Sequence, residues 1–404
     1  MPKQGIYRLK GTLQHYAWGG TDFIPSLIGT TNADKQPCAE LWMGAHQRGP
    51  ATVQLPTANQ ALHDFIANDP QQTLGAKVID AFGESLPYLF KVLDVNKMLS
   101  IQAHPTRAAA IAGFADENAR GIPLTARHRN YKDDNHKPEV MVALTEFYLL
   151  HGFRQIEDIA DVLERVPEFV SLQPHFRQQD IKALYRSIME MPQEDVNTLL
   201  EPMKKRLLPQ LQAGQLSKDY PDYWAALAFQ DYPDWCDRGI FSIYLFNLVR
   251  VDAGQGIFQD AGIPHAYLEG VNVELMANSD NVFRGGLTPK HIDVNELLAH
   301  LVFEPVVPNI LNGTSIATGV RVYKTPAPDF ELSAIELEET FTVESTATTP
   351  ETFIVMEGQL TMHTSETQLA GRQGEVFFVL PGTSYKLSGK ARLFRAAVPD
   401  ETVK

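Results

Sequence analysis

The sequence predicts a mainly β protein with a jelly-roll-like core, a helical insertion and a second, C-terminal jelly-roll-like unit. Three observations lead to this fold class. Short apolar runs separated by Gly and Pro fill both ends of the 404-residue chain, as is typical of strands joined by turns. Apolar residues recur at helical spacing between residues 153 and about 240. One arrangement, a Gly turn, an apolar strand, a Pro and a further strand, occurs twice, in GQGIFQDAGIPHAYL and GRQGEVFFVLPGTSYKL.

These patterns divide the chain into four segments. We expect residues 1–152 and 241–320 to form the two parts of the β core, 153–240 the insertion and 321–404 the C-terminal β unit. The first of the two similar arrangements has His265 after its Pro, whereas the second reads PGTSY at that place. A metal site is therefore expected in the core and not in the C-terminal unit.

The N-terminal stretch through SLIGTT and LWMGAHQRGPATVQL is expected as strands and turns. A short helix follows, on which Leu62, Phe65 and Ile66 share one face. LPYLFKVLDVNKMLSIQA then has the composition of a strand, which Pro105 ends. We expect a polar loop rich in Arg and His from there to Asn135, and a strand that begins within HKPEVMVALTEFYLL. Three earlier polar and aromatic residues are expected at a packed β edge rather than in direct chemistry: Glu40, Trp42 and His46.

Two helices of the insertion are predicted by apolar residues at the i, i+3, i+4, i+7 spacing. They are Ile156, Ile159, Ala160 and Leu163 in the first and Ile181, Leu184, Tyr185 and Ile188 in the second. DVNTLLEPMKKRLL continues the trend, and helix ends are expected at Pro167, Pro192, Pro202 and Pro209. The β pattern returns at FSIYLFNLVRV, and Asp293 with Glu296 predicts the start of a further helix over VNELLAHLV.

Composition excludes several classes of protein. The chain is 44% hydrophobic and 21% charged, and it lacks the roughly 20-residue apolar run that spans a bilayer. The start, MPKQGIYRLKGTLQHYAWGG, has no signal-peptide core, so we expect a cytoplasmic protein without a membrane partner. The net charge of −14 argues against nucleic-acid binding. Cys38 and Cys236 are too few for a disulfide framework or a Cys-rich zinc module, so a metal would need His, carboxylate and amide ligands.

Four residues of these types are candidate metal ligands. Gln102 and His104 lie two apart in the expected strand and would point to the same face. Glu139 opens the next strand, and His265 lies between two later strands. Two imidazoles, a carboxylate and an amide oxygen suit zinc, and also Mn, Co or Fe. Taken alone, a His near a Gln is usually a hydrogen-bonded structural pair.

The second cluster is ELMANSDNVFRGGLTPK, a stretch rich in Gly and Asn. Glu274, Asp280, Arg284 and Lys290 fall within these seventeen residues, and charged residues on such loops often carry function. An ordinary surface loop with weak ion pairs is the alternative. A basic stretch between residues 97 and 137 offers local positive charge for an anionic substrate, or is simply solvated.

The motifs IQAHP, HKPEV, IPHAYLEG and above all ELMANSDNVFRGGLTPKHID resemble those of the type I phosphomannose isomerases, the mannose-6-phosphate isomerases of the cupin superfamily. AWGG and AELWMGAH near the N-terminus are similar to that family too, and the resemblance covers essentially the whole chain. One departure is Gly285, where the family commonly has Ala. This loss of a methyl group should leave Arg284 in place.

The resemblance implies a zinc enzyme of mannose metabolism that interconverts mannose 6-phosphate and fructose 6-phosphate through an enediol. It implies one zinc ion on Gln102, His104, Glu139 and His265, and an active-site arginine at Arg284. Candidates for the remaining roles are Lys137, Glu274 and Asp280 as the base, His136 in ring opening, and Ser100, Lys290 and Tyr267 in substrate binding.

Two alternatives stay open. One is a cupin-type sugar binder without turnover, and the other is an isomerase for a different sugar phosphate. The partner is in each case a small molecule. The oligomeric state is open, and a monomer fits.

Overall fold

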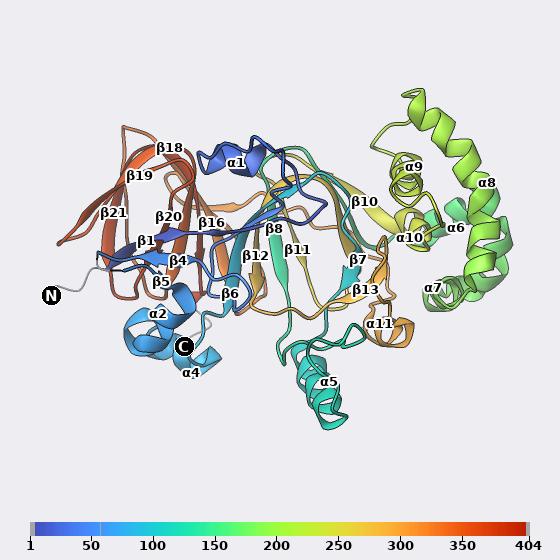
Figure 1. Cartoon of the computed structure of the whole chain (residues 1–404). Coiled ribbons are helices and arrows are strands. Elements are labelled where there is room, and N and C mark those ends of the chain that lie inside the picture. The colour runs from blue at the N-terminus through green and yellow to red at the C-terminus, as the bar shows by residue number, and fades with distance from the viewer. Residues whose placement is uncertain (1–4, 57, 401–404) are drawn as a thin grey trace.

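The computed structural model describes residues 5–56 and 58–400. Figure 1 shows three parts in a row: a C-terminal β unit at one end, a central β unit, and a group of helices at the other end. Within the described residues, the strands form an 11-stranded and a 10-stranded sheet. The expectation of a mainly β protein with helices is therefore confirmed, whereas the jelly-roll assignment and the domain limits stay predictions.

The 10-stranded sheet forms the central unit and is built around one long strand, β12 (His265–Ala277), which pairs antiparallel with four others. These partners are β6 (Tyr88–Val95), β7 (Ile101–Ala103), β8 (Glu139–Ala143) and β9 (Phe147–Phe153). The remaining strands are β2 (Thr12–Gln14), β3 (Glu40–Trp42), β10 (Phe246–Val251), β11 (Gly256–Gln259) and β13 (Phe283–Gly286). Residues that are distant in the sequence thus meet along β12.

The two faces of β12 have different characters because successive side chains alternate. Val271, Val273 and Leu275 enter an apolar core that also holds side chains of the C-terminal unit. Asn272 and Glu274 lie on the opposite face and are nevertheless buried. Buried polar groups require partners, so this second face is where a functional site is expected.

The 11-stranded sheet joins the two ends of the chain. Strand β1 (Ile6–Lys10) pairs antiparallel with β20 (Val376–Val379), so the N-terminal strands extend the C-terminal unit. The other members are β4 (Thr52–Gln54), β5 (Gln60–Ala61), β14 (Thr314–Ala317), β15 (Val320–Tyr323), β16 (Glu331–Leu337), β17 (Val343–Thr346), β18 (Glu351–His363), β19 (Gln368–Arg372) and β21 (Ser384–Ala397). The local patterns do not reveal this long-range pairing.

The insertion is helical, as the apolar spacing predicts. Its elements are α6 (Ile156–Arg165), a 3-10 helix (Pro167–Gln179), α7 (Ile181–Met189), α8 (Gln193–Gln212), α9 (Pro221–Asp231) and α10 (Gly239–Leu245). The predicted face of α7 is buried throughout, whereas on α6 Ile159 and Leu163 are buried, Ile156 is half-buried and Ala160 is exposed. The buried residues share one apolar cluster with core residues such as Phe153 and Phe283. The insertion is therefore packed onto the core through a continuous hydrophobic contact.

The remaining described helices lie around the sheets: α1 (Phe23–Leu27), α2 (Leu62–Asn68), α3 (Pro70–Thr73), α4 (Ala76–Phe82), α5 (Arg107–Ala119) and α11 (Val294–His300). The predicted helix at Leu62 is confirmed, and the Asp293 side chain caps α11 by accepting from the Glu296 N–H at 3.0 Å. Among the described helices, none has the length and apolar character to cross a membrane.

Several local expectations are wrong. The stretch expected as a loop after Pro105 contains α5, because Thr106 caps it by accepting from the Ala109 N–H and three alanines favour the helix. Pro202 and Pro209 lie inside α8 rather than at helix ends.

The first turn of α8 does begin after Pro192, and four apolar residues of that helix are buried. Tertiary packing of this face offsets the cost of the internal prolines. Two other boundaries also differ from expectation. The first two residues of SLIGTT belong to the helix α1, and FSIYL belongs to α10, so the β pattern returns only at Phe246.

Candidate metal centre and substrate cleft

Three candidate ligands converge in the core. His104, Glu139 and His265 come from the end of β7, the start of β8 and the start of β12, and one ligand atom of each lies within 4.8 Å of the others. The His104 Nε2 atom lies 3.5 Å from Glu139 Oε1, and His265 Nε2 lies 3.3 Å from Glu139 Oε2. All three side chains are at most 1% exposed. The geometry fits a buried metal site.

The orientation of both imidazoles is set by backbone carbonyls. His104 Nδ1 lies 2.7 Å from the Asn281 carbonyl oxygen, and His265 Nδ1 lies 2.9 Å from that of Ile263. A proton on each Nδ1 leaves both Nε2 atoms as acceptors. These Nε2 atoms and Glu139 Oε2 are buried and have no hydrogen-bond partner in the described structure. Buried lone pairs that face one another are satisfied by a cation, so the residues present fit a metal ion.

Electrostatics favour the ligand forms of these side chains. Burial, together with the charge of Lys137, lowers the pKa of His104 to about 4, which keeps the imidazole neutral. Burial alone would raise the pKa of Glu139, but Lys137 and His104 outweigh it and hold that pKa well below its ordinary value. The Lys137 Nζ atom lies 2.9 Å from Glu139 Oε1. Lys137 is thus held at the metal centre.

Gln102 lies on β7 itself, whereas His104 follows the last residue of that strand. In the sheet, Gln102 is in register with His265 on one side and with Arg284 on the other. Its half-buried side chain lines the cleft described below. The position is suitable for a fourth ligand, and this role stays a prediction.

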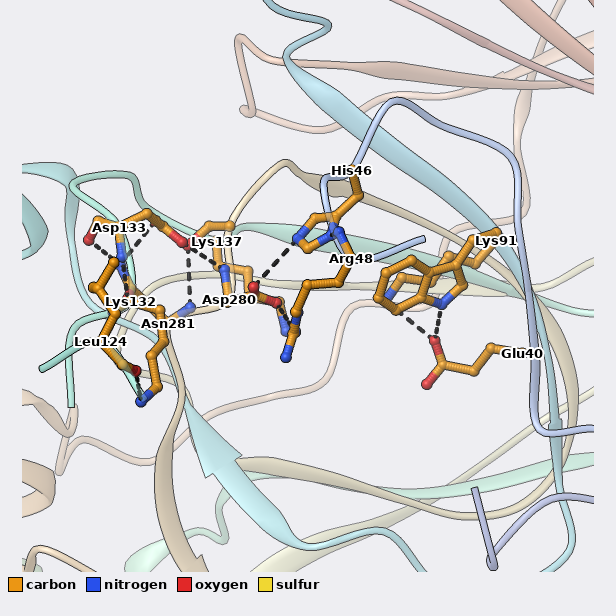
Figure 2. A network of polar contacts seen from close by, with 12 residues as sticks. Glu40, His46, Arg48, Lys91, Leu124, Lys132, Asp133, Lys137, Asp280 and Asn281 are labelled. Atoms are coloured by element: carbon orange, nitrogen blue, oxygen red, sulfur yellow. Dashed lines mark hydrogen bonds and ion pairs between the residues drawn. The ribbon is translucent and has the colours of Figure 1, made fainter. Parts of the chain in front are cut away.

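Beside the centre lies a buried cluster of one lysine and two carboxylates. Lys91 Nζ lies 3.0 Å from Glu274 Oε2 and 3.6 Å from Glu40 Oε2. The Trp42 Nε1–H donates to Glu40, and the Lys91 ammonium lies 5.5 Å from the Trp42 ring centroid. Figure 2 shows the Glu40 carboxylate pointing toward Lys91. Burial raises the pKa of Glu274, against the opposing effect of Lys91.

Sequence reasoning did not select Lys91. Its signal is a single lysine within the apolar strand YLFKVLDV, every residue of which is buried. Lysine is almost never fully buried without a partner, so this position alone predicts buried carboxylates nearby. Glu40, which we expected at a packed β edge, lines the cleft.

Asp280 is bound by two basic side chains. Its carboxylate lies 3.3 Å from His46 Nε2 and accepts from Arg48, as Figure 2 shows. Burial would raise its pKa, but the hydrogen bond and charge of His46 outweigh burial and bring the pKa to about 2. Its backbone N–H donates to Asp133. An anion held in this way is a weak proton acceptor.

His136 points away from its neighbour Lys137. Its Nε2 atom lies 2.7 Å from Asp329 Oδ2, and an Arg107 nitrogen lies 2.9 Å from Asp329 Oδ1. Asp329 is fully buried and belongs to the chain segment that leads into β16. The imidazole thus contacts the C-terminal segment and is not among the residues that line the cleft. Its role in ring opening stays a prediction.

The cleft has a volume of about 580 Å³. Its polar lining includes four of the predicted site residues, Ser100, Gln102, Arg284 and Lys290, together with Glu40, Lys97 and Thr288. Burial lowers the pKa of Lys290, and the charge of Arg284 lowers it further. The cleft thus combines a cationic end with the approach to the metal ligands.

Tyr267 is not part of this cleft. It is 1% exposed inside the core, and its hydroxyl has no hydrogen-bond partner in the described structure. A larger hollow of about 860 Å³ lies on the C-terminal unit, where exposed Glu, Arg and Lys side chains line it. It holds none of the candidate residues.

Comparison with known proteins gives a consistent result. Residues 6–156 match the family model "Phosphomannose isomerase type I, catalytic domain". The mannose-6-phosphate isomerase of Salmonella typhimurium is 38% identical over 403 residues, with 96% of this chain and 99% of the relative covered. The mannose-6-phosphate isomerase of Escherichia coli is 39% identical over 397 residues, with 96% of this chain and 99% of the relative covered. The human one is 33% identical over 414 residues, with 95% of each covered.

Solved structures agree with these relatives. A crystal structure of mannose 6-phosphate isomerase from Salmonella typhimurium, bound to its substrate fructose 6-phosphate and to zinc, superposes with a TM-score of 0.88 at 35% identity. The superposition covers 98% of this chain and 100% of the Salmonella chain. A zinc-bound structure of mannose 6-phosphate isomerase superposes with a TM-score of 0.89, at the same identity and coverage.

Proposed function

The chain belongs to the type I phosphomannose isomerase family, and we propose that it is a zinc-dependent aldose–ketose isomerase. Its substrates would be mannose 6-phosphate and fructose 6-phosphate, interconverted through an enediol. The observation that carries the proposal is the unpartnered set of buried His104, Glu139 and His265 atoms beside a cleft with Arg284 and Lys290.

We infer that zinc would be held by Gln102, His104, Glu139 and His265. When bound there, it supplies a Lewis acid that polarises sugar oxygens. The neutral imidazoles and the ionised carboxylate are the ligand forms that zinc requires.

The cationic end of the cleft suits the charged parts of the substrate. Lys290 and Ser100 are ordinary phosphate donors, and both line the cleft. Arg284 is in register with Gln102 on the neighbouring strand, and we assign it to the negative charge that develops on the enediolate oxygen. The two cations would thus serve two different charges of one substrate.

The proton transfer needs a base. In the direction from aldose to ketose, the base removes the C2 proton, the C2–H electron pair becomes the C1–C2 double bond, and O1 gains the negative charge. A proton then moves from the O2 hydroxyl to O1, an O2 electron pair forms the C2–O2 double bond, and the C1–C2 double-bond pair takes the proton back from the base at C1, which gives the ketose. A base works best when its pKa is close to the working pH. This favours Glu274, whose pKa burial raises, over Asp280, whose pKa is about 2. Lys137 at the metal centre stays the other candidate.

The test is a coupled assay with mannose 6-phosphate. We expect turnover that a chelator abolishes and added zinc restores, together with about one zinc ion per chain. Binding of the sugar phosphate without turnover would identify a cupin-type sugar binder instead. Faster turnover of another aldose phosphate would assign a different substrate.

We expect a cytoplasmic enzyme without nucleic-acid or membrane partners. A monomeric state is compatible with this function.

A further inference from the structure

The link between α9 and α10 of the insertion lies directly against the segment that follows β13. A Cβ atom on Gly239 would lie 2.6 Å from the Leu287 backbone nitrogen, and one on Gly286 would lie 2.4 Å from the Gly239 Cα atom. Gly286 also has a φ of +137°, which side chains rarely allow. The two backbones are therefore in contact, and glycine on both sides permits it.

One buried carboxylate joins the two segments. Asp237 is 5% exposed. Its Oδ1 atom accepts from the backbone N–H of Gly239 and of Leu287, both at 2.7 Å, and its Oδ2 atom accepts from that of Thr288 at 3.1 Å. Hydrogen bonds from backbone N–H groups to a carboxylate are among the strong ones. Two of the three donors belong to the segment after β13.

Leu287 is constrained further. The Tyr232 hydroxyl, from the residue after α9, donates to the Leu287 carbonyl at 2.8 Å. Both polar backbone groups of Leu287 are thus bound by the insertion. Leu287 has a φ of +52°, a left-handed conformation that is unfavourable for leucine and persists only where its surroundings enforce it. The side chain is 2% exposed within the cluster shared with the insertion.

The residues on either side of Leu287 face the cleft. Arg284 precedes it, and Thr288, Pro289 and Lys290 follow it in the cleft lining. We propose that Asp237 is a positioning residue that fixes residues 284–290, so that Arg284 and Lys290 meet the charged groups of the substrate. The insertion then supports the substrate-binding segment. The inference rests on the proposed function and gives the insertion a role in it.

The test compares two substitutions in the full-length chain. Asp237→Ala removes all three acceptor bonds, whereas Asp237→Asn can keep the two at Oδ1 and lose only that to Thr288. A displacement of reacting groups by about 1 Å can lower the reaction rate about 100-fold. We expect Asp237→Ala to raise the KM for mannose 6-phosphate at least about tenfold and to weaken inhibition by inorganic phosphate in parallel. The kcat should fall as well, because Arg284 belongs to the same segment, and the zinc content should stay unchanged. The KM and the phosphate inhibition of Asp237→Asn should lie between those of Asp237→Ala and wild type.

Asp222→Asn is the matched control. Asp222 accepts from Tyr244 within the same insertion, away from the cleft. It should lower thermal stability without changing KM or phosphate inhibition. The proposal is overturned if folded Asp237→Ala keeps both values within about twofold of wild type, or if Asp222→Asn changes them as much. If Asp237→Ala does not fold, the same criteria apply to Asp237→Asn.

Amide hydrogen exchange separates this inference from the proposed function. The amides of Leu287 and Thr288 should be protected in the wild-type chain and exchange at least about tenfold faster in Asp237→Ala, whereas in Asp237→Asn only the Thr288 amide should do so. A wild-type chain without isomerase activity that shows this pattern would contradict the proposed function while leaving the support of the segment intact. Equal exchange in variant and wild type would refute the support itself.

Discussion

Replacing Lys91 by Met tests the buried cluster beside the metal centre most directly. The side chains of Lys91, Glu40 and Glu274 are 8%, 10% and 5% exposed, and both carboxylates lie within 3.6 Å of the ammonium. Methionine retains the packing volume but leaves two carboxylates buried without their cation. Removal of one partner from a buried ion pair costs about 3–5 kcal/mol. We expect Lys91→Met to lower the free energy of unfolding by this amount at pH 8.

The loss should depend on pH with a definite sign. Burial raises the pKa of Glu274 and Lys91 opposes it, so removal of Lys91 should raise that pKa further above the unfolded value. A group whose folded pKa is raised destabilises the folded state as pH rises through that pKa. The stability deficit of Lys91→Met relative to wild type should therefore be smaller at pH 5 than at pH 8.

Urea unfolding followed by circular dichroism at both pH values measures this. The matched control is Lys218→Met, since Lys218 pairs with Glu269 where both side chains are more than a third exposed. It should cost about 1 kcal/mol or less. The double variant Lys91→Met/Glu274→Gln should recover part of the loss, because it removes one unpaired charge. An equal deficit at pH 5 and pH 8, or no recovery in the double variant, would refute the electrostatic reasoning.

Four further predictions concern the metal centre and residues 284–290 beside it. Glu139→Gln should reduce bound zinc to well below one ion per chain and abolish turnover, as metal analysis and the coupled assay would show; retention of full zinc would argue against its ligand role. Arg284→Ala should lower turnover at least about 100-fold with zinc content unchanged, and near-normal turnover would remove its assigned role. Gly286→Ala should cost at least about 2 kcal/mol in urea unfolding, since a Cβ would lie 2.4 Å from Gly239 Cα at a φ of +137°. Gly285→Ala, which restores the residue common in the family, should stay within about 1 kcal/mol, because its Cβ would lie 3.0 Å from an Ile101 methyl group that can shift.

Sequence reasoning identified the family, which the comparisons confirm, and it selected three residues that the fold brings together. The residue types of these three side chains alone suggest a metal site. Only the resemblance to the family predicts that the three lie close together. His104 and His265 are far apart in the chain and meet because β12 pairs with β7. Such pairings have no local periodicity, so the sequence predicts the strands more securely than their neighbours.

Local reasoning failed where tertiary contacts outweigh propensity or where a short signal was missed. Pro202 lies within α8 because the apolar face of that helix is buried against the rest of the insertion. The helix after Thr106 was missed because its charged residues suggested a loop, although three consecutive alanines favoured a helix. Lys91 was overlooked because its apolar neighbours predicted only a strand.

The contacts of Asp237 cannot be predicted from patterns in the sequence. A carboxylate that binds backbone N–H groups of a distant segment places no demand on the side chains of that segment. Residues 287 and 288 would present the same N–H groups with many other side chains, so neither end of the contact has a characteristic sequence. The periodicity of the insertion reports only its own buried faces. A contact between an insertion and a substrate-binding segment can therefore determine binding geometry, even though the helical pattern alone suggests a separate structural unit.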